Sequence, residues 1–239
     1  MNPVLVACSH GTSDPAGQET IRRLLAAVWR ALPAFEVRGA AVDVETDILL
    51  PGVLDSLIRP AVVVPLLLSG GYHVHHDIAQ AVASRPDRAA AAPLGPDWEL
   101  AEIGVRRLNE AGARSDDVVV LGASGSSDPR AMASIEEAAR RLGSLWGGRI
   151  AVGHVGHSGV PLRDAVADAQ QPGRRVVVSS YLLAPGHFQH ELEQAGAHLV
   201  TAPILTPSPD PALVDLVIRR FEEAALDVSW ANPTPVRGA

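Results

Sequence analysis

Apolar residues recur along the chain in two alternating patterns, which are short continuous runs and longer stretches with helical spacing. The run at residues 4–9, VLVACS, is apolar or small throughout, which is typical of a strand buried on both faces. The next stretch, residues 16–32, carries apolar side chains on one helical face: Ile21, Leu24, Leu25, Val28 and Leu32. Asp14 and Pro15 precede it as the expected N-cap and first helical residue.

The same alternation continues to near residue 225. Strands are expected at the apolar runs 4–9, 37–44, 61–68, 88–92, 118–123, 150–155, 174–182 and 198–201. Helices are expected between them, at 16–32, 73–84, 98–111, 129–145, 187–194 and 211–225. Strands that alternate with helices favour parallel sheets with helices on both faces, so the predicted fold class is α/β.

Two motifs occur twice in the chain with the same separation. Residues 4–15, VLVACSHGTSDP, match residues 118–129, VVVLGASGSSDP, and residues 65–78, PLLLSGGYHVHHDI, match residues 179–192, SSYLLAPGHFQHEL. Both pairs are offset by 114 positions, which indicates an internal duplication. We therefore expect two similar α/β halves, 1–114 and 115–228, that pack together, and a disordered tail at 229–239.

Composition narrows the class of protein. Of the 239 residues 47% are hydrophobic but only 4% are aromatic, so the core must be built from Ala, Val and Leu. A net charge of -7 without a basic run argues against a nucleic-acid partner. The single cysteine, Cys8, excludes an internal disulfide and a metal cage made of cysteines alone. Without a signal-like start or a run long enough to span a bilayer, a cytoplasmic protein with no membrane partner is expected.

Candidate chemistry lies after the strands of the first half, because parallel sheets bind ligands beyond the carboxyl ends of their strands. His10 follows the first strand, His73 and His76 share a helical face after the third, and Asp43 and Glu45 point to one side of the second. Imidazole and carboxylate groups together suit Fe²⁺, Co²⁺ or Ni²⁺, so these side chains predict a mononuclear metal site. The structural alternatives are a capping histidine, a solvated helix start and an exposed acidic pair.

The second half keeps only part of this pattern. Ser124 replaces the first histidine, His157 stands at the position equivalent to Asp43, and His187 is retained. We therefore expect the chemistry in the first half and the other wall of a cleft in the second. His154 and His157 are interpreted as one buried and one solvated histidine at a strand end, with a remnant or auxiliary metal site as the alternative.

These residues resemble a known family. The SHGT segment after the first strand, and GYHVHHDI at 71–78 after a strand that ends in PLLL, look like the paired motifs of class II chelatases. The resemblance is to the sirohydrochlorin cobalto- and ferrochelatases (CbiX/SirB-like proteins), and it covers both halves. It implies that a tetrapyrrole binds between the halves, with His10 and His73 as catalytic histidines and metal ligands. Asp43 would be the third ligand, with Glu45 as the alternative register and His76, His157 and His187 as auxiliary candidates.

The same resemblance implies how substrates are handled. The divalent metal (Co²⁺, Fe²⁺ or Ni²⁺) is a substrate and not a retained cofactor, ATP is not used, and the sequence has no P-loop motif. Sirohydrochlorin carries eight carboxylates, so an acidic protein must bind it through local groups. These are expected to be free backbone N–H groups at the helix starts 12–14 and 70–73, together with serines and nearby arginines. The residues expected to contact it are Ser9, Gly11, Thr12, Ser13, Gly70, Gly71 and Tyr72.

Three other functions are compatible with parts of the sequence. A metal-binding or metal-delivery protein could use the same histidines without a macrocycle. Histidine phosphatases also place a histidine after the first strand, but they need an arginine where Ser9 stands. Protoporphyrin ferrochelatases are typically longer and have a more apolar pocket. The sequence leaves open the oligomeric state and the choice between siroheme and cobalamin biosynthesis.

Overall fold

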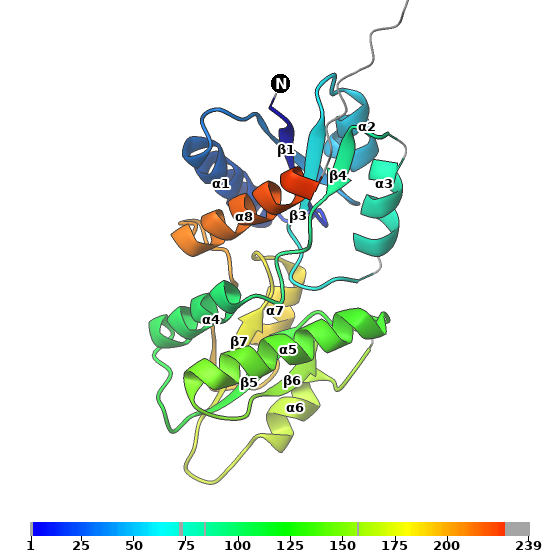
Figure 1. The fold of residues 1–239 in the computed structure, drawn as a ribbon. Coiled ribbons are helices and arrows are strands. Elements are labelled where there is room, and N and C mark those ends of the chain that lie inside the picture. Colours follow the sequence, from blue (N-terminus) through cyan, green and yellow to red (C-terminus); the bar gives the residue numbers. More distant parts are fainter. Residues whose placement is uncertain (1, 72–73, 84, 157, 228–239) are drawn as a thin grey trace, which may run out of the picture.

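The computed structural model describes residues 2–71, 74–83, 85–156 and 158–227, with the backbone alone for residues 74, 75 and 227. Two parallel four-stranded sheets form the centres of two stacked halves (Figure 1). The first sheet has the order β2-β1-β3-β4 and the second the order β6-β5-β7-β8, so the second repeats the first shifted by four strands. This repetition confirms the predicted fold class of two similar α/β halves. The division at residue 114 stays a prediction.

The strands coincide with the apolar runs of the sequence. They are β1 (Val4–Ser9), β2 (Val37–Ala41), β3 (Ala61–Pro65), β4 (Arg88–Ala90), β5 (Val118–Ala123), β6 (Ala151–His154), β7 (Val176–Tyr181) and β8 (Leu199–Val200). The longer helices are α1 (Pro15–Ala31), α4 (Trp98–Glu110), α5 (Pro129–Trp146) and α8 (Pro211–Asp227). The shorter ones are η1 (Thr46–Ile48), α2 (Leu50–Asp55), η2 (Val74–Ile78), α3 (Ala79–Ala83), α6 (Leu162–Asp168) and α7 (His187–Glu193).

Several elements differ from the sequence prediction. The helix expected at 73–84 begins as a π-helical turn, η2, and continues as the short helix α3. Helices α2 and α6 lie where the sequence analysis predicts no helix. The predicted strands 37–44 and 61–68 are both wrong at their ends, since β2 stops at Ala41 and β3 at Pro65.

Alternate residues of each central strand enter different parts of the core. Leu5 and Ala7 of β1 belong to the cluster under α1, whereas Val4, Val6 and Cys8 belong to the cluster that includes α2. All five are buried, since helices cover both faces of the sheet. This explains why the strands read as continuous apolar runs and do not alternate with polar residues.

The last helix of each half covers the sheet of the other half. Helix α8 packs on β3, β4 and α1 of the first half, whereas α4 packs on α5 and β7 of the second (Figure 1). The two exchanged helices also contact each other, and Asp97, the N-cap of α4, accepts a hydrogen bond of 2.7 Å from Arg220 on α8. The exchange joins both halves through one continuous hydrophobic core. None of the described helices is both long and apolar enough to cross a membrane.

The exchange predicts that the far end of α8 is essential to the first half. Phe221 is buried and its ring meets that of Phe35 edge to face, with centroids 5.2 Å apart. Phe221→Ala should lower the free energy of unfolding by about 3–5 kcal/mol, measured by equilibrium urea unfolding. The control Leu226→Ala changes an 86% exposed side chain of the same helix and should cost less than about 0.5 kcal/mol. Equal costs for the two variants would contradict the packing of α8 on the first half.

Candidate functional site

An open cleft of about 930 Å³ lies between the halves. Its walls include segments that follow β1, β2 and β3 of the first sheet and β5, β6 and β7 of the second, which places it at the carboxyl ends of both sheets. The volume is at the upper end of the range of about 300–1,000 Å³ for small-molecule sites. The cleft therefore has room for one large ligand, bounded by loops of both halves.

The loop after β1 brings the first predicted histidine to the cleft. His10 is exposed and lines the cleft with Ser9, Gly11, Thr12 and Ser13, as the sequence predicts for this edge. Gly11 has a φ of 97°, and a Cβ atom there would lie 1.9 Å from the carbonyl oxygen of Asp43. Only glycine allows this approach, so His10 enters the cleft beside the backbone of the next loop.

The acidic pair of the second loop lies in a turn and not on a strand. The chain leaves the sheet after Ala41, the Asp43 amide donates to the carbonyl oxygen of His10 (3.0 Å), and the Glu45 amide donates to the carbonyl oxygen of Asp43 (2.7 Å). The expectation that Asp43 and Glu45 share one side of a strand is therefore wrong. Val44, between them, has a φ of 66° and lines the cleft, which the sequence did not indicate.

Glu45 has a partner inside the protein. Its Oε1 accepts a hydrogen bond of 3.1 Å from the amide of Thr12, so this carboxylate links the 43–45 turn to the loop after β1. The contact restrains the segment on which His10 stands. Asp43 accepts a hydrogen bond of 2.7 Å at its Oδ1 from the amide of Val44, and its side chain is otherwise exposed beside the same loop.

The loop after β3 is fixed from the other half. The phenol of Tyr181 on β7 donates a hydrogen bond of 3.0 Å to the carbonyl oxygen of Leu68. Burial raises the pKa of Tyr181, so the phenol stays a protonated donor. Leu66–Ser69 and Gly71 line the cleft, whereas Gly70 is buried.

The second predicted histidine comes next along the chain. Tyr72 and His73 lie outside the described residues, and His76 is exposed on η2. No group of three or more His, Cys, Asp or Glu side chains in the described ranges is arranged to hold a metal ion. The predicted set of His10, His73 and Asp43 includes an undescribed member and stays a prediction. Cys8 does not complete it, because burial raises the pKa of its thiol to about 12 and disfavours the thiolate.

The second half supplies a wall of hydroxyl and apolar groups. Ser124 and the residues up to Ser127 follow β5, at the position that the sequence repeat aligns with the loop of His10. His187 and Phe188 enter the cleft at the start of α7, and Nε2 of His187 lies 3.2 Å from Oε1 of Glu191. The repeated motif could have identified these residues, since it places both loops at equivalent strand ends.

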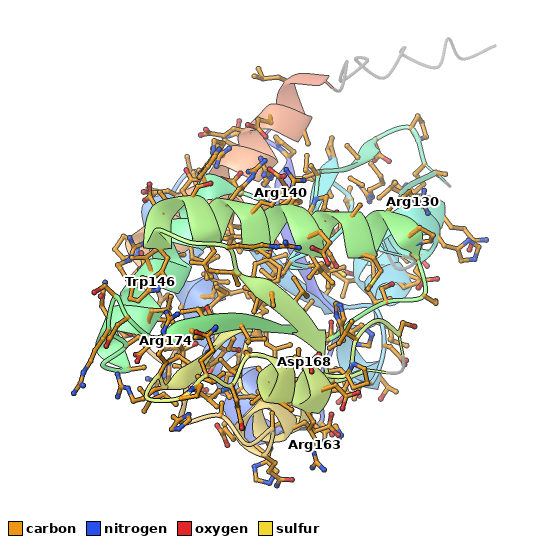
Figure 2. The ribbon with its side chains drawn as sticks, turned by 90° about the horizontal axis from the view of Figure 1, so that it is seen from below. Arg130, Arg140, Trp146, Arg163, Asp168 and Arg174 are labelled. Carbon is orange, nitrogen blue, oxygen red and sulfur yellow. The ribbon has the colours of Figure 1, made fainter. Side chains whose placement is uncertain are left out.

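The described lining of the cleft contains hydroxyls and two histidines but neither arginine nor carboxylate side chains. The chain has no lysine, so its 20 Lys and Arg residues are all arginines. In the second half, Arg130, Arg140, Arg163 and Arg174 extend from the outer surface (Figure 2). The expected contribution of arginines to ligand binding is therefore not found in the described lining.

The helix start after His10 also differs from expectation. The amides of Ala16 and Gly17 donate to Oδ1 of the N-cap Asp14, at 2.8 and 3.0 Å, and the amide of Thr12 is bound to Glu45. The prediction of free N–H groups at residues 12–14 is wrong for Thr12 and for Asp14, whose amide donates to Oγ1 of Thr12 (3.1 Å). Ligand groups that enter the cleft here meet hydroxyls and the imidazole of His10.

His154 lies behind this wall, at the end of β6. It is 4% exposed, in contact distance of Gly125 and Gly159, and within the described ranges its Nδ1 has no hydrogen-bond partner. Burial lowers its pKa, an effect that the charge of Glu136 opposes. The prediction of a buried histidine is confirmed for His154, whereas His157 lies outside the described residues.

Comparison with known proteins gives one family match and several similar structures. The CbiX family model matches the chain twice, over residues 4–111 and 118–224. The structure of SirB from Bacillus subtilis with Fe³⁺ is similar over 95% of this chain and 97% of that chain, with 19% sequence identity and a TM-score of 0.78. DR2241 from Deinococcus radiodurans, a multi-domain protein with structural similarity to chelatases and two additional novel domains, is similar over 92% of this chain and 55% of its own, with 19% identity and a TM-score of 0.64. None of the curated protein sequences compared matches this chain.

The close approach of Gly11 to Asp43 makes a specific stability prediction. Gly11→Ala combines a left-handed backbone with a steric clash and should lower the free energy of unfolding by about 3 kcal/mol. Gly112→Ala is the matched control, because Gly112 has a φ of 76° but nothing lies within 4 Å of its Cβ position. It should cost only about 1–2 kcal/mol in urea unfolding. Equal losses for both variants would show that the two loops do not touch at Gly11.

The lowered pKa of His154 makes a pH prediction. Below the ordinary histidine pKa of 6.5, His154 is protonated in the unfolded chain but stays neutral in the folded protein. The free energy of unfolding therefore falls as the pH drops below about 6.5. His154→Ala, which introduces the residue found at the equivalent position 40, removes this loss. Between pH 6.5 and 5 the wild type should lose stability faster than the variant, by up to about 1.4 kcal/mol per pH unit. If the free energy of unfolding, measured with urea, falls equally with pH in the two proteins, the burial of a neutral imidazole is contradicted.

Proposed function

The chain belongs to the CbiX family, and we propose that it is a cytoplasmic sirohydrochlorin chelatase, which inserts a divalent metal ion into this tetrapyrrole without ATP. The observation that carries the proposal is the cleft between the duplicated halves, with His10 on its wall. The structural similarity to SirB supports the same fold over nearly the entire chain.

The reaction exchanges two pyrrole N–H protons for one M²⁺ ion. In this proposal His10 and His73 hold the incoming ion as neutral imidazoles and then accept the released protons as general bases near neutral pH. Asp43 offsets the charge of the ion and raises the basicity of the histidines. The exposed position of His10 in the cleft supports its role, and the backbone contact between the two loops supports a place for Asp43 beside it.

The two halves have different roles in this proposal. Chemistry belongs to the first half, because Ser124 replaces the histidine in the second. His76, His157 and His187 are auxiliary candidates, while the hydrogen bond from Thr12 supports a bracing role for Glu45. The substrate contacts proposed are Ser9, Gly11, Thr12, Ser13, Gly70, Gly71 and Tyr72.

The metal proposed is Fe²⁺ or Co²⁺, as a substrate of the reaction and not as a resident cofactor. Fe²⁺ would place the enzyme in siroheme biosynthesis and Co²⁺ in cobalamin biosynthesis. The Fe³⁺ in the SirB structure supports iron among the metals to be tested. Imidazole and carboxylate ligands accept either ion, so availability of the metal contributes to the choice.

Anaerobic incubation of the protein with sirohydrochlorin and Co²⁺ or Fe²⁺ tests the proposal through the visible spectrum of the macrocycle. We expect faster metal insertion than in the protein-free reaction. His10→Ala should reduce the enzymatic rate by about 100-fold or more and leave binding of the metal-free macrocycle nearly intact. His190→Ala, an exposed histidine of α7 outside the lining of the cleft, is the control and should retain the rate.

The possible failures point to different functions. Binding of the macrocycle without acceleration would favour a carrier or a different metal. Metal binding without macrocycle binding would favour a metal-delivery protein. If the protein neither binds the macrocycle nor accelerates metal insertion, the proposed function is contradicted. Full activity of His10→Ala would remove that histidine from the mechanism.

A further inference from the structure

Two large apolar side chains are exposed on the walls of the cleft, one from each half. Val44 in the 43–45 turn is 47% exposed and Phe188 of α7 is 44% exposed, and both line the cleft. The other exposed large apolar residues of the described chain lie outside this lining: Trp29, Ile58, Trp98, Leu145, Val160 and Leu226. Apolar side chains left exposed within a ligand-sized cleft indicate contact with an apolar surface of the ligand.

Val44 is held in a backbone conformation that disfavours its side chain. Its φ of 66° lies in the left-handed region, where a β-branched residue is a rare outlier and Gly or Asn is usual. The turn is fixed from both sides by the bond between the Glu45 amide and Asp43 (2.7 Å) and by the bond between Thr12 and Glu45 (3.1 Å). Strain of this kind clusters at ligand clamps, so an exposed and strained valine in a cleft indicates a contact made by its side chain.

Phe188 is exposed, unlike the two other phenylalanines of the chain, which pack in the core. Phe35 and Phe221 pack against each other, whereas the ring of Phe188 lies in the cleft, tilted by 41° against the ring of His187 with 5.7 Å between centroids. The residues that precede it, from Leu182 to Pro185, also line the cleft with largely apolar groups. An aromatic ring in this setting suits the π face of a planar ligand.

We propose that Val44 and Phe188 bind the apolar ring system of the tetrapyrrole and thereby set its position relative to His10. This inference rests on the proposed function, and it attributes the affinity for the macrocycle to contacts with apolar side chains. The absence of arginine from the described lining fits that assignment, because no guanidinium group there can pair with the peripheral carboxylates. The two residues are binding determinants contributed by different halves.

Binding of metal-free sirohydrochlorin, followed by absorbance titration without any metal, tests the inference. Val44→Gly and Phe188→Ala should each raise the Kd roughly tenfold, because each removes a side chain buried by the ligand. Matched controls are Val160→Gly (52% exposed) and Leu145→Ala (44% exposed), which lie outside the lining and should leave the Kd within twofold.

The melting temperature gives a second test of Val44→Gly, because it should rise while the affinity for the macrocycle falls. Because glycine adopts a positive φ without strain, the unliganded variant should melt about 2 °C above the wild type while it binds the macrocycle more weakly. Val160→Gly should show no such gain. A merely structural valine would not combine higher stability with weaker binding.

The outcomes separate this inference from the proposed function. Wild-type Kd values for both Val44→Gly and Phe188→Ala would overturn the inference, even if the protein inserts metal. A lower melting temperature for Val44→Gly would overturn the role of backbone strain. If the wild-type protein binds no macrocycle, the proposed function itself fails. If His10→Ala binds the macrocycle but does not insert metal, the binding residues are distinct from the residue required for metal insertion.

Discussion

Parallel sheets need helices on both faces, and in this protein each half supplies one of those helices to the other. Helix α8 covers the first sheet and α4 the second, so neither sheet is complete without the opposite half. The exchange fixes the relative position of the two sheets through buried contacts such as that of Phe221. It also aims the carboxyl ends of both sheets at one cleft. The site therefore depends on an interface that is part of the core and not on a separate domain contact.

The loops on the walls of the cleft are held in place by contacts with other loops that are distant along the chain. Gly11 permits the backbone of the first loop to touch Asp43, and Glu45 binds the amide of Thr12 in return. Across the interface, Tyr181 holds the loop after β3 at Leu68. The bonds from Thr12 to Glu45 and from the Glu45 amide to Asp43 hold the turn in which Val44 has its left-handed conformation.

Much of the fold follows from the sequence, because strands buried on both faces read as apolar runs and the 114-residue offset aligns two copies of them. The exchange of α4 and α8 could not be predicted, since the same helical pattern would arise if each helix covered its own sheet. The end of β2 was misjudged because the turn at Asp43 is set by contact with Gly11, far away in the sequence. The position of His10 at the cleft was predictable from the strand-end rule, whereas the strain at Val44 is a property of tertiary contacts alone.

The duplication explains why equivalent positions have diverged. In the proposed function the metal chemistry needs only one wall of the shared cleft, which would leave the second wall to ligand contact and packing. Ser124 stands where the first half has His10, and Phe188 stands where the sequence repeat places Val74. His154 shows the same freedom in the core, because it fills space behind Gly125 and Gly159 where the first half has the small residue Ala40. A symmetric pair of histidine sites would place two chemical centres on one ligand, whereas in the proposed arrangement both walls contact the ligand and only the first half reacts with it.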